Sequence, residues 1–86
     1  MASYRVLFSK SIRQDVRGID KAQLSRIMDS IRTLAENPFP SGCKRLKGAR
    51  SSYRIRVGRY RVVYEVEVEA ATVTIFRIRH RKVVYR

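Results

Sequence analysis

Residues 53–67 read YRIRVGRYRVVYEVE, and this stretch determines the fold class. Apolar and charged side chains alternate before and after Gly58 and Arg59, which is typical of two antiparallel strands joined by a two-residue turn. The stretch therefore predicts a β-hairpin, and the length of its turn sets the cross-strand pairs. These are Val57 with Tyr60, Arg56 with Arg61, and Ile55 with Val62.

This register places three arginines on one side of the sheet, because Arg54 lies two residues from Arg56 on the same strand. Like charges directly opposite each other destabilise a sheet, so the pair of Arg56 and Arg61 needs a reason. A bound phosphate or an acidic partner is one interpretation. The other is a solvated face with Glu65 or Glu67 as counterions. We favour phosphate binding, because further arginines follow near the end of the chain: Arg77, Arg79 and Arg81.

The half of the chain before the hairpin predicts one strand and two helices. Residues 4–8 have a strand pattern, and residues 10–17 form a short helical segment that ends at Gly18. Residues 20–36 predict the longest helix, with a capping box from Asp20 to Gln23 and a stop at Asn37 and Pro38. Its apolar side chains recur at helical spacing, at Leu24, Ile27, Met28, Ile31, Leu34 and Ala35.

The order of these elements predicts an α+β fold in one domain, residues 1–86. An N-terminal strand and two helices precede a mostly antiparallel twisted sheet of about four strands, with the helices packed on one face. Residues 72–78 form a strand that is apolar on both faces, and residues 82–85 a short closing strand. A chain of 86 residues is too small for a large internal pocket, so its chemistry belongs on an open face.

The charge of the chain indicates a polyanionic partner. Lys and Arg number 20 against 7 Asp and Glu, a net charge of +13. Residues 44–86 hold 13 of the basic and 3 of the acidic groups, so +10 lies in the second half. Arginine, of which the chain has 15 against 5 lysines, binds phosphate bidentately and stacks on bases, which favours a nucleic acid over a membrane surface.

Other chemistries find little support in the sequence. One cysteine, Cys43, excludes an intrachain disulfide, and with one histidine it cannot build a structural zinc site. We interpret Cys43 as structural, and Tyr53, Tyr60 and Tyr64 as packing residues. No apolar run approaches the length of a membrane span, and no phosphate loop or dinucleotide motif occurs. We therefore expect a cytoplasmic protein with no metal and no cofactor.

Several motifs in this order resemble the RelE branch of the RelE/ParE toxin superfamily. They are Leu46-Lys47-Gly48, residues 53–64, Ile78-Arg79-His80-Arg81, and Val84-Tyr85. The resemblance implies a single RelE-like toxin domain with a microbial-RNase-type fold. It also implies the toxin component of a type II toxin-antitoxin system, a ribosome-dependent endoribonuclease that cleaves mRNA in the A site and inhibits translation. Its expected partners are the ribosome, mRNA and a cognate RelB-like antitoxin.

The resemblance also implies a set of site residues. Transferred by position, the catalytic residues are Arg54, Arg56, Arg61, Arg81 and Tyr85. To these we add His80, because histidine is the residue type most often used to transfer protons near neutral pH, and as substrate-binding residues Lys47, Arg59 and Arg79. In such enzymes the 2′-hydroxyl of the substrate attacks the adjacent phosphate, so the reaction needs no metal.

One departure from the family concerns the proton acceptor. Well-known members carry lysines where this chain has Arg54 and Arg56. Arginine stays protonated at neutral pH, so it cannot readily accept a proton as a general base. Tyr85 and His80 are two alternatives. A third is that most of the rate comes from bending the mRNA into an in-line geometry.

Two other functions compete with the ribonuclease. One is a ParE-like inhibitor of DNA gyrase with the same fold. The other is a noncatalytic protein that binds RNA or the ribosome, in which the arginines serve affinity alone.

Overall fold

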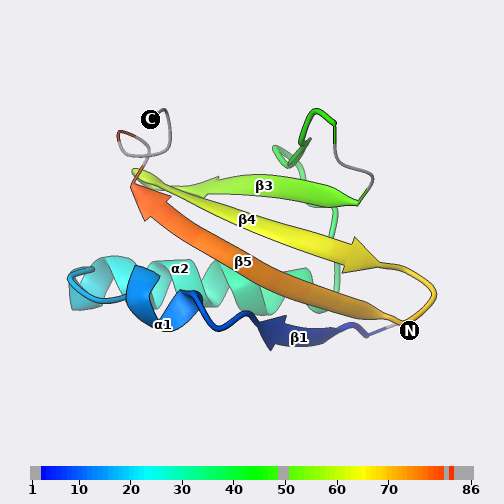
Figure 1. Cartoon of the computed structure of the whole chain (residues 1–86), viewed down its shortest axis with the longest axis horizontal. Coiled ribbons are helices and arrows are strands. Elements are labelled where there is room, and N and C mark those ends of the chain that lie inside the picture. Colours follow the sequence, from blue (N-terminus) through cyan, green and yellow to red (C-terminus); the bar gives the residue numbers. More distant parts are fainter. Residues whose placement is uncertain (1–2, 49–50, 81, 83–86) are drawn as a thin grey trace.

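The computed structural model describes residues 3–48, 51–80 and 82, and the predicted α+β order of elements is confirmed. Along the chain, two helices follow the first strand, and the three longest strands come after them (Figure 1). The elements are β1 (Arg5–Phe8), α1 (Ile12–Asp15), α2 (Lys21–Leu34), β2 (Lys44–Arg45), β3 (Ser52–Val57), β4 (Tyr60–Glu67) and β5 (Thr72–His80).

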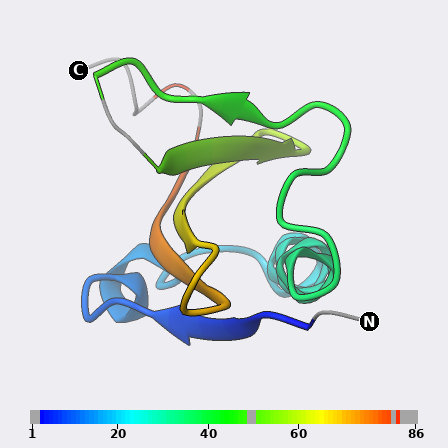
Figure 2. The same cartoon turned by 90° about the vertical axis from the view of Figure 1, so that its right-hand side faces the viewer.

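The sheet has five strands in the order β1-β5-β4-β3-β2. Figure 2 shows them following one another from β1 at the bottom to β2 at the top, with a pronounced twist. The predicted sheet had about four strands. The additional one, β2, has only two residues, too few to produce a sequence pattern. A second difference is that β1 pairs with β5 in parallel. The two helices lead the chain from β1 to the opposite edge of the sheet, and the antiparallel strands β2 to β5 then bring it back beside β1. The closing strand predicted over 82–85 falls mostly outside the described residues.

The hairpin has the predicted register. Val57 pairs with Tyr60, Arg56 with Arg61 and Ile55 with Val62. Gly58 at its turn has a φ of 59°, in the left-handed region where a side chain is strained. A Cβ atom there would also lie 3.3 Å from Oε1 of Gln23, so the turn packs closely against the start of α2.

The core lies between α2 and the inner face of the sheet. The predicted helical stripe is confirmed, with Ile27, Ile31 and Leu34 fully buried. The predicted capping box is wrong: Asp20 stands at the N-cap, but its side chain makes no capping hydrogen bond, and the Gln23 amide lies toward the hairpin turn instead. The rest of the buried core comprises Ile12, Ile55, Val57, Val62, Tyr64, Val66, Val73, Ile75 and Ile78.

A β-bulge at Phe76 divides β5 into two parts. Val63 of β4 pairs with Arg77, and the next residue, Tyr64, pairs with Ile75, so Phe76 has no partner on β4. The extra residue lets Ile75 and Ile78 both face the core, although they are an odd number of positions apart. It also turns Arg77 and Arg79 to the outer face. This explains why β5 looks apolar on both faces in the sequence.

The segment around α1 covers the edge of β5 beyond the end of β1. The Ser9 amide donates to the Ile75 carbonyl at 2.9 Å, and the Ser11 hydroxyl donates to the Phe76 carbonyl at 3.1 Å. The Ile78 amide donates to Oδ2 of Asp15 at 3.0 Å. While α2 covers the inner face, α1 thus satisfies backbone groups at an edge that β1 leaves open.

Tyr64 is a core residue, as predicted, and connects the sheet to the loop after α2. Its side chain is fully buried, and its hydroxyl donates to the Pro38 carbonyl at 2.7 Å. Burial, with a smaller contribution from the neighbouring Cys43 thiol, raises the pKa of Tyr64 well above its usual range. The hydroxyl therefore stays protonated and acts as a permanent donor.

Replacing Tyr64 by Phe should lower the free energy of unfolding by about 1–3 kcal/mol, because the buried Pro38 carbonyl loses its donor. Urea unfolding measures the effect. Tyr53→Phe is the matched control, because Tyr53 stacks on Tyr64 but is only half-buried. A change below about 0.5 kcal/mol is expected there. Equal losses in both variants would contradict the assigned role of the hydrogen bond.

Deleting Phe76 should leave the chain folded. The shortened strand keeps Ile75 and Ile78 on the inner face in a regular ladder, at a cost of about 1–2 kcal/mol for altered edge hydrogen bonds. Deleting Thr74 is the control, because it forces Val73 or Ile75 off the core face and should cost at least about 3 kcal/mol. Thermal unfolding of both proteins distinguishes the outcomes. A larger loss for the Phe76 deletion would refute this account of the bulge.

Candidate phosphate-binding face

Arginines from three neighbouring strands form a row on the outer face of the sheet. Arg61 of β4 pairs with Arg56 of β3 on one side and with Arg79 of β5 on the other. Strands lie about 4.8 Å apart, so the row spans about 10 Å. In the next row, Val63 lies between Arg54 and Arg77. We call these five residues the outer arginine face: Arg54, Arg56, Arg61, Arg77 and Arg79.

The side chains of the outer arginine face differ in exposure. Arg56 and Arg77 are exposed, whereas Arg54, Arg61 and Arg79 are half-buried. The Nε atom of Arg61 is buried, so the aliphatic stem that leads to it is shielded from solvent. A central guanidinium held in this way can present its charge with little loss of side-chain entropy on binding.

One carboxylate reaches this face from α1. Oδ1 of Asp15 lies 3.5 Å from Nη1 of Arg77 and 3.8 Å from Nε of Arg79. Asp15 is thus a carboxylate that pairs with both Arg77 and Arg79. No sequence signal distinguished Asp15, because its partners lie more than sixty positions away and are reached only through the packing of α1 on β5.

The structure does not bring His80 to the outer arginine face. His80 pairs with Tyr60 across β4 and β5, and its ring meets the Tyr60 ring edge-on at 5.4 Å. This pair alternates with the pair of Arg61 and Arg79, so the His80 ring faces the other side of the sheet. The Lys82 amide donates to Nδ1 of His80 at 3.2 Å, which leaves Nε2 as the nitrogen that carries the proton in the neutral ring.

The remaining predicted residues are distributed around this face. Arg79 is part of the row itself, Arg59 lies exposed in the turn between β3 and β4, and Lys47 lies exposed in the turn after β2. Arg81 and Tyr85 lie outside the described residues. Of the predicted catalytic residues, the structure therefore groups Arg54, Arg56 and Arg61.

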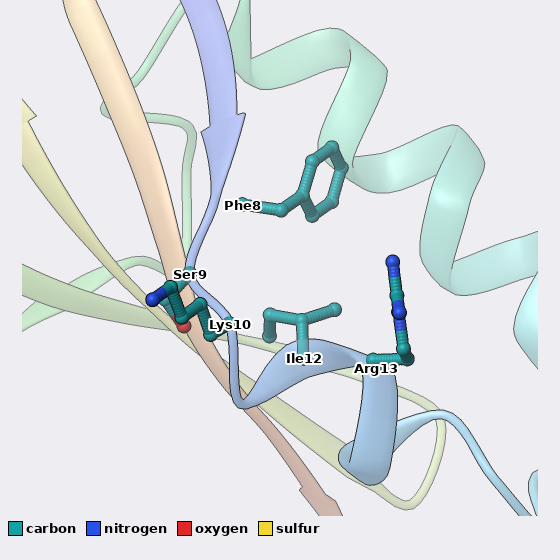
Figure 3. A pocket seen from close by; sticks show the side chains of 5 residues that line it. All are labelled: Phe8, Ser9, Lys10, Ile12 and Arg13. Atoms are coloured by element: carbon teal, nitrogen blue, oxygen red, sulfur yellow. The ribbon is translucent and has the colours of Figure 1, made fainter.

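A separate apolar pocket of about 670 Å³ lies between β1 and α1. Phe8 and Ile12 border it, with the basic side chains of Lys10 and Arg13 at its margin (Figure 3). It shares no residue with the outer arginine face. Phe8 is 45% exposed, so part of its ring is open to solvent beside this pocket.

The described part of the chain holds neither a cluster of metal ligands nor a membrane-spanning helix. Within residues 3–48, 51–80 and 82, no three or more His, Cys, Asp or Glu side chains cluster as metal ligands would. No helix in the same part of the chain is long and apolar enough to cross a membrane.

A small α+β chain with five arginines on one sheet face has the physical features of a polyanion-binding protein, and known proteins define its class further. The family model for the ParE toxin of the type II toxin-antitoxin system parDE matches residues 6–85. Two toxins of Methanocaldococcus jannaschii, RelE1 and RelE3, are each 31% identical to this chain. The matches cover 96% and 94% of this chain, and the same shares of the two relatives.

Solved structures agree with these relatives. The archaeal RelE-RelB complex from Pyrococcus horikoshii matches with a TM-score of 0.81 and 27% identity, covering 92% of this chain and 96% of that chain. The chain therefore belongs to the ParE toxin family of type II toxin-antitoxin systems, as a toxin of the RelE type. The resemblance found in the sequence is confirmed.

Replacing Arg56 by Thr should stabilise the protein, because it removes a like-charge pair and adds a side chain favoured in strands. We expect a gain of about 0.2–1 kcal/mol in the free energy of unfolding, shrinking as salt screens the repulsion. Urea unfolding at low and high ionic strength measures it.

The matched control is Arg5→Thr, which removes the same charge from an exposed strand position opposite Thr72. Equal gains in the two variants would show that lower net charge, and not the pair of Arg56 and Arg61, is the cause.

Proposed function

We propose that this RelE-type toxin is an endoribonuclease that cleaves mRNA in the ribosomal A site and thereby inhibits translation. The observation that carries the proposal is the row of Arg56, Arg61 and Arg79 across three strands. Repulsion within such a row lowers the stability of the free protein. A phosphate bound on the row would accept hydrogen bonds from the guanidinium groups and neutralise part of their charge. Because the proposed substrate is mRNA bound to the ribosome, we place the activity in the cytoplasm.

The row fits the electrostatic demands of cleavage by a 2′-hydroxyl. Attack on the adjacent phosphate gives a transition state with extra negative charge on the phosphoryl oxygens, and leaves a 2′,3′-cyclic phosphate and a 5′-hydroxyl. Guanidinium groups fixed before the reaction stabilise that charge without having to reorganise. Arg61 has a neighbour on each side, so we assign it the central contact to the phosphate. The nucleophile belongs to the RNA, so the step requires no metal ion.

Among the proton acceptors considered, His80 is the least suited by its position. Its ring contacts Tyr60, and strand alternation turns it to the side of the sheet opposite the row, so we place it away from the 2′-hydroxyl. Tyr85 and alignment of the mRNA by the ribosome are the alternatives that we retain. To Arg81, which the resemblance places among the catalytic residues, we assign the role of assisting the leaving oxygen.

The partner that we propose is a RelB-like antitoxin. Relatives of this chain have been solved as RelB-RelE complexes, among them one from Methanococcus jannaschii at 30% identity and a TM-score of 0.76. A net charge of +13 favours an acidic partner, and the exposed Phe8 beside the apolar pocket favours one that also carries apolar side chains (Figure 3). An amphipathic acidic segment meets both requirements.

The test adds purified toxin to ribosomes programmed with a defined mRNA and maps new 5′ ends. The unmutated protein should cut in the A site, and Arg61→Ala should slow cutting by about a hundredfold, the loss typical of one transition-state contact. His80→Gln should retain the rate within a few-fold. An mRNA with a single 2′-deoxy sugar at the cut position should resist cleavage.

Arg26→Ala provides the matched control, because Arg26 is exposed on α2 and carries the same charge. If no A-site cuts appear with the unmutated protein, the proposal is wrong. If Arg26→Ala slowed cleavage as much as Arg61→Ala, the row would contribute only through the net charge of the protein.

Inhibition of DNA gyrase is the second candidate, favoured by the ParE description of the matching family model. A supercoiling assay on relaxed plasmid separates the two functions. Inhibition of supercoiling without mRNA cleavage would support the gyrase alternative.

A further inference from the structure

We propose that Asp15 is a positioning residue, which orients Arg77 and Arg79 on the outer arginine face and limits how strongly that face binds RNA. The inference rests on the proposed function, because it concerns how RNA lies on the face. It assigns a functional role to a carboxylate on α1, outside the strands that carry the arginines.

The two oxygens of Asp15 have different partners. Oδ2 accepts the Ile78 amide at 3.0 Å, which anchors the carboxylate to the edge of β5. Oδ1 lies between two guanidinium groups, 3.5 Å from Nη1 of Arg77 and 3.8 Å from Nε of Arg79. Since Ile78 lies between these two arginines in sequence, one carboxylate contacts three consecutive residues of the strand.

The side chain of Asp15 is only 7% exposed, whereas the guanidinium-bearing side chains of Arg77 and Arg79 are 47% and 39% exposed. A buried carboxylate is costly unless it is paired, so its charge needs a reason. Covering the edge of β5 does not require charge. Two residues earlier on the same edge, the neutral hydroxyls of Ser9 and Ser11 bind the Phe76 carbonyl. The negative charge at position 15 is therefore matched to the two arginines.

Two consequences follow for the row. Arg79 stands beside Arg61, so restricting its guanidinium restricts one end of the row that we assign to the phosphate. Asp15 also adds a negative charge beside Arg77 and Arg79, which lowers the repulsion between these two arginines and their attraction for any phosphate. Asp15 thus favours one productive arrangement of RNA at the expense of nonspecific affinity.

The decisive variant is Asp15→Asn, which keeps an oxygen to accept the Ile78 amide and removes the charge. Asp29→Asn is the matched control: Asp29 pairs with Arg32 on the exposed side of α2, and the substitution changes the net charge equally. Each protein is measured for melting temperature, for affinity to a single-stranded RNA oligonucleotide, and for A-site cleavage of mRNA on ribosomes.

Asp15→Asn should bind the oligonucleotide about threefold more tightly, with a steeper dependence on salt, because the face gains an effective positive charge. Its kcat for cleavage should fall by about tenfold, the scale expected when a positioned group is loosened. Asp29→Asn should change neither quantity by more than about twofold. Asp15→Glu, which restores the charge, should recover part of the rate.

A purely structural role for Asp15 predicts a different pattern. Affinity and rate would then fall together, in proportion to the unfolded fraction given by the melting curve, and this result would overturn the proposal. So would an Asp15→Asn protein with the kcat and affinity of the Asp29→Asn control.

A further measurement does not depend on activity. In NMR spectra of the free protein, the signals of the Arg77 Nη1 and Arg79 Nε groups, which lie nearest Oδ1 of Asp15, should shift in Asp15→Asn. If the unmutated toxin cuts no RNA but these signals and the RNA affinities change as expected, the ribonuclease proposal fails and the role of Asp15 stands. Unchanged signals in Asp15→Asn would refute that role.

Discussion

The bulge at Phe76 is the constraint on which both faces of the sheet depend. In a regular β5, alternation would place Val73, Ile75, Arg77 and Arg79 on one face, so either two arginines would enter the core or Ile78 would leave it. One extra residue resolves this conflict by changing the phase within the strand. The inner face then closes on α2, and the outer face receives arginines from three strands.

The outer arginine face concentrates charge that the free protein must tolerate. Arg61 lies between Arg56 and Arg79, and repulsion in such a row works against folding. Burial of the Arg61 stem and the carboxylate of Asp15 offset part of the cost. In our proposal the same charge binds the phosphate backbone of mRNA and an acidic antitoxin. Stability and binding thus oppose each other in the same side chains, as in many functional sites.

Local signals predicted the parts of the fold in which neighbours along the chain are also neighbours in space. The turn at Gly58 determines the pairs of the hairpin, and the helical spacing of Ile27, Ile31 and Leu34 determines the buried side of α2. The capping box at Asp20 was wrong, because the Asp20 side chain makes no capping hydrogen bond, and the Gln23 side chain lies near the hairpin turn at Gly58, in a distant part of the chain. The strand β2 was missed because two residues carry no period.

By itself, the sequence determined the α+β class, the hairpin with Arg54, Arg56 and Arg61 on one side, the basic second half and the resemblance to RelE-type toxins. Only the tertiary structure decided which face Arg77 and Arg79 take, that β5 continues as far as His80, and that Asp15 pairs with both arginines. The reason is physical: alternation and turn length act between adjacent residues, whereas a bulge and the packing of α1 on β5 depend on contacts across more than sixty positions of chain.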